Sequence, residues 1–405
     1  MIQEQSITDQ LKIYKAELSN ELGNILDYWT KHTPDHTNGG FIGRIDSEEN
    51  IIADAPKGSV LNARILWSFS AAYNLNKNPA YLQYAERAYQ YIIDHFIDND
   101  NGGVYWSVNY KGEPLDTKKQ VYAIAFTIYA LSEYYWASGN KNVKKTAISL
   151  YNLLVTRSYD AINTGYLEAF TCDWQPIGDL RLSAKDANEK KTMNTHLHVL
   201  EAYTNLYRIW PDEGLRAQIV TLLNNFLTHF IDPQTHHLLL FFDENWNSRS
   251  DLVSYGHDIE ATWLMQEAAE VIHDEKLIEK IKAINIPITE VTLDDIDADG
   301  GLWYEYEPAD NHIIKQKHWW PQAEAMVGFY NTWQITGDDK YLKQSIKSWA
   351  FVKNKILDKV NGEWIWGIDE KGQPMPNEDK AGIWKCPYHN SRACIEILKR
   401  ANTLV

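Results

Sequence analysis

Hydrophobic residues recur at helical spacing in pairs of neighbouring segments along this chain. Between residues 121 and 136, Ile124, Ile128 and Leu131 are separated by three or four positions, which places them on one helix face. A second apolar stripe follows after a break at Gly139. The same pair of helices is predicted in five places, at residues 63–73 and 81–96, 121–136 and 143–158, 196–210 and 214–231, 258–272 and 276–284, and 323–335 and 341–355.

An aromatic tract, introduced by glycine in five of its six copies, separates successive helix pairs. From Gly40 to Gly103 is 63 residues, from Gly103 to Gly165 is 62, and from Gly301 to Gly362 is 61. The 136 residues between Gly165 and Gly301 are two steps of 68, with a copy that lacks glycine between them. Such a period indicates one supersecondary unit used six times. The tracts lie at residues 38–41, 101–106, 164–168, 237–242, 299–304 and 361–366.

Six helix pairs joined by turn-rich segments predict an all-α fold, an (α/α)6 barrel with short hairpins and long loops at one rim. Two tracts are expected to form hairpins with turns at Gly112 and Gly372, where lysine-glycine suits a positive φ. An open solenoid is the alternative. Six units with long loops on one side favour closure, and residues 1–405 are expected to form a single catalytic domain.

Composition narrows the class of partner. The 405 residues carry a net charge of −16, which argues against nucleic acid and anionic membrane surfaces. No run of 18 apolar residues occurs, so no membrane helix is expected. Residues 1–6 lack the features of a secretory signal, and three cysteines without a CxxC spacing indicate a reducing compartment. We therefore expect a cytoplasmic protein, a monomer or a weak homodimer, that binds a small molecule.

Aromatic residues make up 13% of the chain and gather in the turn-rich tracts. A large helical core accounts for most of them. Loops do not usually bury so much ring surface, and flat rings lining a cleft are how proteins bind the apolar faces of sugars. The pair Trp319-Trp320 precedes Pro321, a residue favoured in the first turn of a helix, so both rings are expected at the rim.

In a closed barrel, the first turns of the six inner helices converge. Three of the residues at equivalent points near these helix starts are histidines. A barrel does not need them for stability, because burying an imidazole costs hydrogen bonds. Neither HExxH nor a cysteine-histidine ligand set occurs, so no metal and no cofactor are expected. His237 and seven other histidines in loops or outer helices are expected at the surface. Equivalent points of the six inner-helix starts supply Arg64, Tyr122, His198, His257, Trp320 and His389.

Imidazole titrates near neutral pH, so two histidines on opposite sides of a carbon atom can remove a proton from one face and deliver one to the other. Epimerisation next to a carbonyl needs this arrangement. An aldose must first open its ring, and proton abstraction at C2 then gives an enediolate. Arg64 is the expected cation for its oxygens, with His198 or Tyr122 as hydrogen-bond donors. No GxGxxG or P-loop sequence is present.

Four long segments resemble the N-acylglucosamine 2-epimerase superfamily, and most closely its cellobiose 2-epimerases. The resemblance spans nearly the whole chain and implies the (α/α)6 fold, together with interconversion of cellobiose with glucosyl-mannose and of lactose with epilactose. The segments are Asn194-Thr195-His196-Leu197-His198-Val199-Leu200-Glu201-Ala202-Tyr203, Ser254-Tyr255-Gly256-His257-Asp258-Ile259-Glu260, Trp319-Trp320-Pro321-Gln322-Ala323-Glu324 and Trp384-Lys385-Cys386-Pro387-Tyr388-His389-Asn390.

The resemblance also implies roles for individual residues. His257 and His389 match the acid/base pair that moves the C2 proton, and Arg64 and His198 match residues that hold the O1/O2 end of the sugar. Trp320 matches a ring that stacks on the reducing-end glucose, and Trp384 matches one that stacks on the second sugar. The remaining implied substrate contacts are Tyr122, Asn194, Glu260 and, in a segment of weaker similarity, Asp186.

Other functions remain open at this stage. A mannobiose, monosaccharide or N-acetylglucosamine 2-epimerase and a mannose isomerase would share the barrel and the histidines. A glycoside hydrolase would need two opposed carboxyl groups, for which Glu260, Asp299, Glu305 and Glu324 are available. A sugar-binding scaffold would explain the aromatic residues without explaining the convergent histidines.

Overall fold

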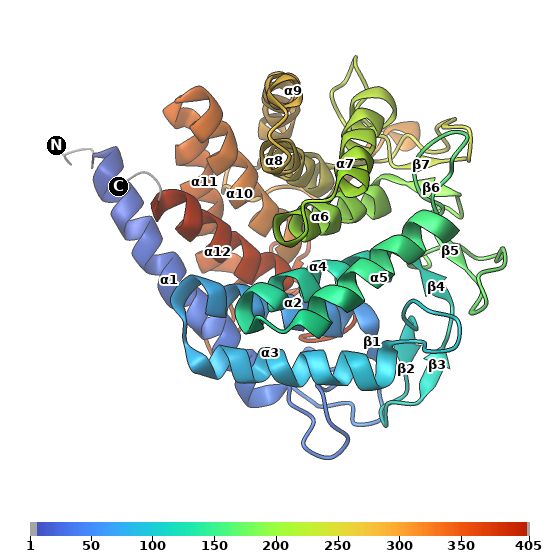
Figure 1. The fold of residues 1–405 in the computed structure, drawn as a ribbon. Helices are drawn as coiled ribbons and strands as arrows, with labels where there is room; N and C mark the ends of the chain where they lie inside the picture. The colour runs from blue at the N-terminus through green and yellow to red at the C-terminus, as the bar shows by residue number, and fades with distance from the viewer. Residues whose placement is uncertain (1–5, 403–405) are drawn as a thin grey trace.

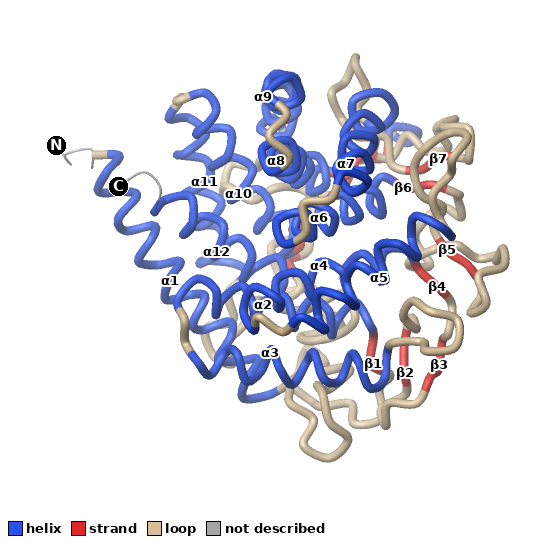
Figure 2. Tube along the Cα trace, in the orientation of Figure 1, coloured by secondary structure: helices blue, strands red, loops and turns tan. Residues whose placement is uncertain are grey.

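Twelve α-helices close into an (α/α)6 barrel in residues 6–402, the part of the chain that the computed structural model describes (Figures 1 and 2). Residues 1–5 lie outside this part. They belong to the N-terminal segment in which the sequence shows no features of a secretory signal. The inner helices are α2 (Ser59–Asn76), α4 (Val121–Ser138), α6 (Met193–Ile209), α8 (Tyr255–Val271), α10 (Trp319–Thr336) and α12 (Tyr388–Asn402). The outer helices are α1 (Ile7–His32), α3 (Pro79–Tyr91), α5 (Lys141–Arg157), α7 (Glu213–Asn225), α9 (Glu275–Asp294) and α11 (Asp339–Phe351).

The two ends of the chain together complete the ring. Each inner helix packs against the next, and α12 packs against α2, so the circle is closed. The outer partner of α12 is α1, the first helix of the chain, which lies beside it in Figure 1. The five predicted helix pairs are present, whereas α1 is an addition to them. Helix α9 continues past its expected end at residue 284, through Pro287, to Asp294.

Burial distinguishes the two rings of helices. The first fourteen residues of α4 are all buried, as expected of a helix that is apolar on every side. Its outer neighbour α5 buries one stripe and exposes the opposite face. No helix between residues 6 and 402 combines the length and apolarity needed to cross a membrane. The α5 stripe consists of Val143, Ala147, Leu150, Tyr151 and Leu154.

Short antiparallel strands connect successive repeats at one rim. A two-residue strand precedes each of the inner helices α2, α4, α6, α8 and α10, so these helices begin at the same rim. The hairpin expected around Gly112 is present, with a φ of 94° at this residue. The pairs are β1 (Lys57–Gly58) with β2 (Ser107–Val108), β2 with β3 (Pro114–Asp116), β4 (Lys119–Gln120) with β5 (Ala169–Phe170), β6 (Lys191–Thr192) with β7 (Phe241–Phe242), β8 (Val253–Ser254) with β9 (Glu305–Glu307), β9 with β10 (His312–Ile314), and β11 (Lys317–His318) with β12 (Gly367–Ile368).

Buried ion pairs hold the glycine-rich loops against these strands. A lysine in the strand contacts an aspartate in the loop, as in Lys119–Asp98 at 2.6 Å. The fourth repeat has Val253 at the lysine position, and His237 instead contacts Asp258 of α8 at 2.8 Å. The expectation that His237 lies at the surface is therefore wrong, because this ion pair holds its side chain half-buried. The other lysine–aspartate pairs are Lys57–Asp35, Lys191–Asp160 and Lys317–Asp297.

Candidate active site

The inner helices place the predicted site residues at two depths, so the expectation that they occupy equivalent points is wrong. The reason is that the number of residues between the start of the helix and the site residue differs from one helix to another. The upper layer comes from the first turn, at the second or third residue, and consists of Tyr122, His257, Trp320 and His389. The lower layer lies about 5 Å deeper and contains the sixth residues of four helices, Arg64, His198, Glu260 and Glu324.

In the upper layer, the indole of Trp320 contacts the imidazoles of both His257 and His389. The ring centroids are 4.7 Å apart for His257 and 5.6 Å apart for His389. Helix α10, which carries Trp320, packs between α8 and α12, which carry the histidines. Nδ1 of His257 is hydrogen-bonded to Oγ of Ser254 at 2.8 Å, and Nδ1 of His389 to Oε1 of Glu324 at 2.7 Å. These bonds orient the rings and leave Nε2 of each for a substrate.

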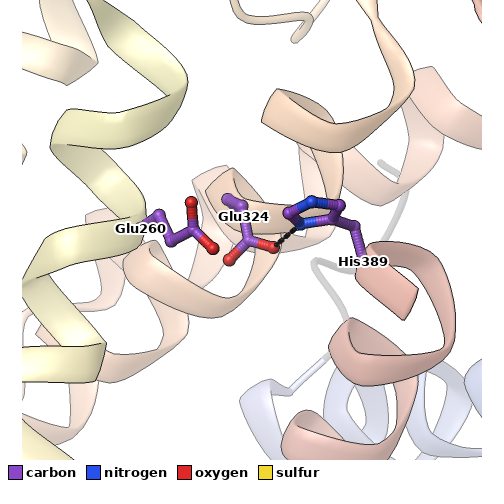
Figure 3. Close-up of side chains that lie close together, drawn as sticks. All are labelled: Glu260, Glu324 and His389. Carbon is purple, nitrogen blue, oxygen red and sulfur yellow. Dashed lines mark hydrogen bonds and ion pairs between the residues drawn. The ribbon is translucent and has the colours of Figure 1, made fainter. Parts of the chain in front are cut away.

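Arg392 holds three carboxylates together in the lower layer. Its guanidinium donates to Oε1 of Glu201, to Oε1 of Glu260 at 2.5 Å, and to Oε1 of Glu324 at 2.7 Å. Figure 3 shows the Glu260 and Glu324 carboxyl groups facing one another, with Glu324 bonded to His389. All these side chains are buried. The cluster therefore supports His389 from below.

Arg64 is a buried cation of a different kind. Its Nη2 donates to the hydroxyl of Tyr122 at 2.8 Å, and its guanidinium lies 4.3 Å from the ring centroid of Phe126 and 4.7 Å from that of Tyr388. Within residues 6–402 it forms no ion pair, and its Nε has no hydrogen-bond partner. The aromatic rings hold its charge in place, available to oxygen atoms of a ligand.

Burial determines the protonation of the three histidines. Burial lowers the pKa of His257 to about 3 and lowers that of His389 well below its usual value, with Arg64 and Arg392 adding to the shift for His389. Burial also lowers the pKa of His198, although Glu201, hydrogen-bonded to its Nδ1 at 2.9 Å, opposes the shift. All three imidazoles are therefore neutral near pH 7.

One group of side chains has the geometry of a possible metal site, but a guanidinium already lies beside it. Oxygen and nitrogen atoms of Glu260, Glu324 and His389 lie within 4.8 Å of one another, close enough to surround a cation. Both carboxylates bond to the guanidinium of Arg392, so the protein itself supplies a cation to them. The donor set thus fits a ligand cluster around Arg392 better than a metal site.

The expected substrate contacts occupy different positions around this centre. Trp384 is half-buried, with its ring 6.0 Å from that of Trp106 and 6.0 Å from that of Tyr122. Asn194 is half-buried in the first turn of α6, and its Oδ1 has no partner in the described chain. Asp186 lies in the loop before β6, where burial raises the pKa of its carboxyl group.

Trp319 does not join the cluster. Its side chain is 3% exposed and packs against Trp366, with ring centroids 4.5 Å apart, and against the ammonium group of Lys385. The expectation that both tryptophans lie at the rim thus applies only to Trp320. Consecutive helical residues point about 100° apart, so only one of the two rings can face the barrel axis.

Sequence reasoning did not place Glu324, Arg392 and Tyr388 in the site. A signal was present, because all three lie in or beside the segments that resemble the epimerases, and Arg392 follows His389 at the spacing i, i+3. This spacing places the two residues on one face of α12. It did not reveal that Glu324 links the two residues by contacting both.

Comparison with known proteins identifies the family. The family model of N-acylglucosamine 2-epimerase matches residues 40–393. The cellobiose 2-epimerase of Bacteroides fragilis is 50% identical over 388 residues, covering 96% of this chain and 99% of that protein. The structure of cellobiose 2-epimerase from Bacillus thermoamylovorans is 42% identical and superposes with a TM-score of 0.91, covering 96% of this chain and all of the other.

A second solved structure agrees with the first. Cellobiose 2-epimerase from Spirochaeta thermophila is 37% identical with a TM-score of 0.93, covering 99% of this chain and 100% of that chain. The shared fold extends over the barrel and its rim, including the segments that carry the histidines. The protein is therefore an isomerase, and this chain belongs to the N-acylglucosamine 2-epimerase family.

Proposed function

We propose that this enzyme epimerises C2 of the reducing-end glucose in β-1,4-linked disaccharides without a cofactor. It converts cellobiose to glucosyl-mannose and lactose to epilactose. The observation that carries the proposal is the pair of neutral, separately oriented imidazoles of His257 and His389 around Trp320. One neutral imidazole is a base for the C2 proton, and the other donates a proton to the opposite face of the carbon.

Ring opening and charge stabilisation use the remaining polar groups. His389 is oriented by Glu324 and assists proton transfer at the ring oxygen. The unpaired guanidinium of Arg64 stabilises the enediolate oxygens, and the hydroxyl of Tyr122 is held beside it. His198, oriented by Glu201, donates a further hydrogen bond from its second ring nitrogen.

The disaccharide preference rests on the half-buried aromatic surface at the rim. Trp320 stacks on the reacting sugar, while Trp384, beside Trp106, stacks on the second sugar. Asn194 and Asp186 supply hydrogen bonds to hydroxyl groups, and Glu260 supports the site from below through Arg392. The relatives of highest identity named above are cellobiose 2-epimerases, which supports the same substrate class.

The carboxyl groups favour epimerisation over glycoside hydrolysis. A hydrolase holds two carboxyl groups about 5–9.5 Å apart on either side of the scissile bond. Glu260 and Glu324 instead share one nitrogen of Arg392 and approach within 4.8 Å of each other. A glycosidic bond does not fit between two carboxyl groups that are joined through one guanidinium nitrogen.

Proton NMR of the purified protein with cellobiose in D2O tests the proposal. We expect mannose-type anomeric signals with deuterium entering only at C2, as epimerisation through an enediol requires. Free glucose would indicate hydrolysis and overturn the proposed reaction. Conversion of mannose or N-acetylglucosamine but not cellobiose would retain the chemistry and reject the disaccharide substrate.

A further inference from the structure

The charges beneath His389 do not balance if every group is ionised. Three buried carboxylates, Glu201, Glu260 and Glu324, contact one guanidinium, that of Arg392, and the second buried cation, Arg64, contacts none of them. With both arginines counted, the buried charges are three negative and two positive. Full ionisation would leave one excess negative charge out of contact with water, which is costly. The neutral imidazoles supply no compensating charge. One bound proton removes the imbalance.

The hydrogen bonds indicate which carboxyl groups hold this proton. Glu201 receives hydrogen bonds from Arg392, His198 and Tyr388. Burial raises its pKa, but the charge of Arg392 and the interactions with His198 and Tyr388 together outweigh burial and lower it to about 2. Glu260 bonds only through Oε1 to Arg392, and its buried Oε2 has no partner in residues 6–402. Burial, and then the charge of Glu324, raise the pKa of Glu260 to about 8.

Glu324 connects this proton to the reacting imidazole. Its Oε1 shares Nη2 of Arg392 with Oε1 of Glu260 and also bonds Nδ1 of His389 at 2.7 Å. Two carboxyl groups so close behave as one titrating pair. Figure 3 shows Glu260 beside Glu324 and the hydrogen bond between Glu324 and the ring of His389.

We propose that Glu260 and Glu324 hold one shared proton and that this acid pair supplies the proton that His389 delivers to the sugar. The inference rests on the epimerase function proposed above. As the Nε2–H bond of His389 breaks and a C–H bond forms at C2, the proton of Glu324 moves to Nδ1. His389 remains neutral throughout, and the acid pair becomes one unit more negative. His257, which has taken the original C2 proton, releases it to water. Nε2 of His389 then takes a proton from water while Nδ1 returns its proton to Glu324, which restores the starting state.

The reverse reaction uses the same path in the opposite sense. His389 then abstracts the C2 proton at Nε2 while Nδ1 returns its proton to Glu324. A purely structural role for Glu260 would leave the pH profile unchanged. The acid pair instead predicts that kcat, in the direction in which His389 protonates C2, falls as the pH rises through about 8, where the shared proton is lost.

Two glutamine variants and an infrared titration test this role. Glu260→Gln keeps the size of the side chain but has no proton to share, so we expect about 10²-fold lower kcat, little change in KM, and no fall in kcat centred near pH 8. Glu324→Gln is expected to have the same effect. In sugar-free protein, the carbonyl intensity of protonated carboxyl groups that titrates near pH 8 should be smaller in Glu260→Gln than in the wild type, and the band of Glu168 should remain.

Glu168 provides a matched control. It is buried, burial raises the pKa of its carboxyl group to about 8, and its hydrogen bonds go to Thr192 and Thr195 rather than to the cluster. Glu168→Gln should remove an infrared band of its own and leave the pH profile of kcat unchanged.

The outcomes separate this inference from the proposed function. Epimerisation by the wild type, with the pH profile and infrared band unchanged in Glu260→Gln and Glu324→Gln, would overturn the acid pair alone. Absence of C2 exchange in the wild type would overturn the proposed function, and proton delivery with it, whatever the infrared band shows.

Discussion

Two buried arginines in one barrel should respond in opposite ways to the same substitution. Arg392 forms ion pairs with three carboxylates, whereas Arg64 forms no ion pair within residues 6–402. Methionine retains much of the length and apolar volume of arginine. Arg64→Met and Arg392→Met therefore compare the loss of an unpaired cation with the loss of a paired one.

The expected magnitudes follow from these contacts. Arg392→Met leaves the carboxylates buried without their cation, which should lower the free energy of unfolding by about 3–5 kcal/mol. Arg64→Met loses a hydrogen bond to Tyr122, worth about 1 kcal/mol, a weak one to the sulfur of Cys386, and the ring contacts of its guanidinium, but it also removes the cost of burying an unpaired charge. Its stability should change by less than about 1 kcal/mol. Loss of its charge from the enediolate should lower kcat by about 10²–10³-fold.

Urea unfolding and NMR-monitored epimerisation measure the two quantities. The comparison is decisive because both side chains are buried and both stack on Tyr388. Equal losses of stability in the two variants would refute the distinction between them. A folded Arg64→Met enzyme with kcat near that of the wild type would remove Arg64 from enediolate stabilisation.

Three further predictions concern the remaining parts of the site. His257→Asn should lower deuterium exchange at C2 by about 10²–10⁴-fold with the fold intact, and wild-type exchange in this variant would exclude His257 as an acid or base. Trp384→Ala should raise KM for cellobiose roughly fivefold, from about 1 kcal/mol of ring stacking, with a smaller effect on mannose; equal effects on both sugars would reject the second-sugar platform. Burial lowers the pKa of His237, but the hydrogen bond and charge of Asp258 outweigh it and raise the pKa above its usual value. The stabilisation is therefore complete below about pH 6.5 and is lost as the pH rises through the folded-state pKa. Urea unfolding of His237→Gln should show a weaker decline in stability over this range than the wild type, and parallel curves would exclude the ion pair as the cause.

Periodicity alone was sufficient to predict the barrel. Apolar side chains three or four residues apart define a helix face wherever they occur, so five helix pairs follow from the chain itself. Most glycines of the aromatic tracts, although not Gly301, adopt positive φ, as at Gly103 with 80°, and the sequence already contained this signal. Helix faces and turn glycines depend on residues only a few positions away in the sequence.

The outer helix α1 shows where that reasoning ends. It was not among the predicted helix pairs, and its partner α12 lies at the other end of the chain, so no local pattern pairs the two. Contact between the chain ends depends on how far each repeat turns around the barrel axis. The complete circle of packed inner helices determines that turn.

The sequence by itself determined which helices form, how many repeats exist, and that histidines stand near the inner-helix starts. Only the tertiary structure decided that Trp319 turns into the core while Trp320 reaches the histidines, and that Glu201, Glu260 and Glu324 meet at Arg392. Helix formation follows from local spacing and backbone hydrogen bonds. The charge cluster requires side chains from four helices, brought within hydrogen-bonding distance by packing around one axis, and its buried charges acquire their protonation only there.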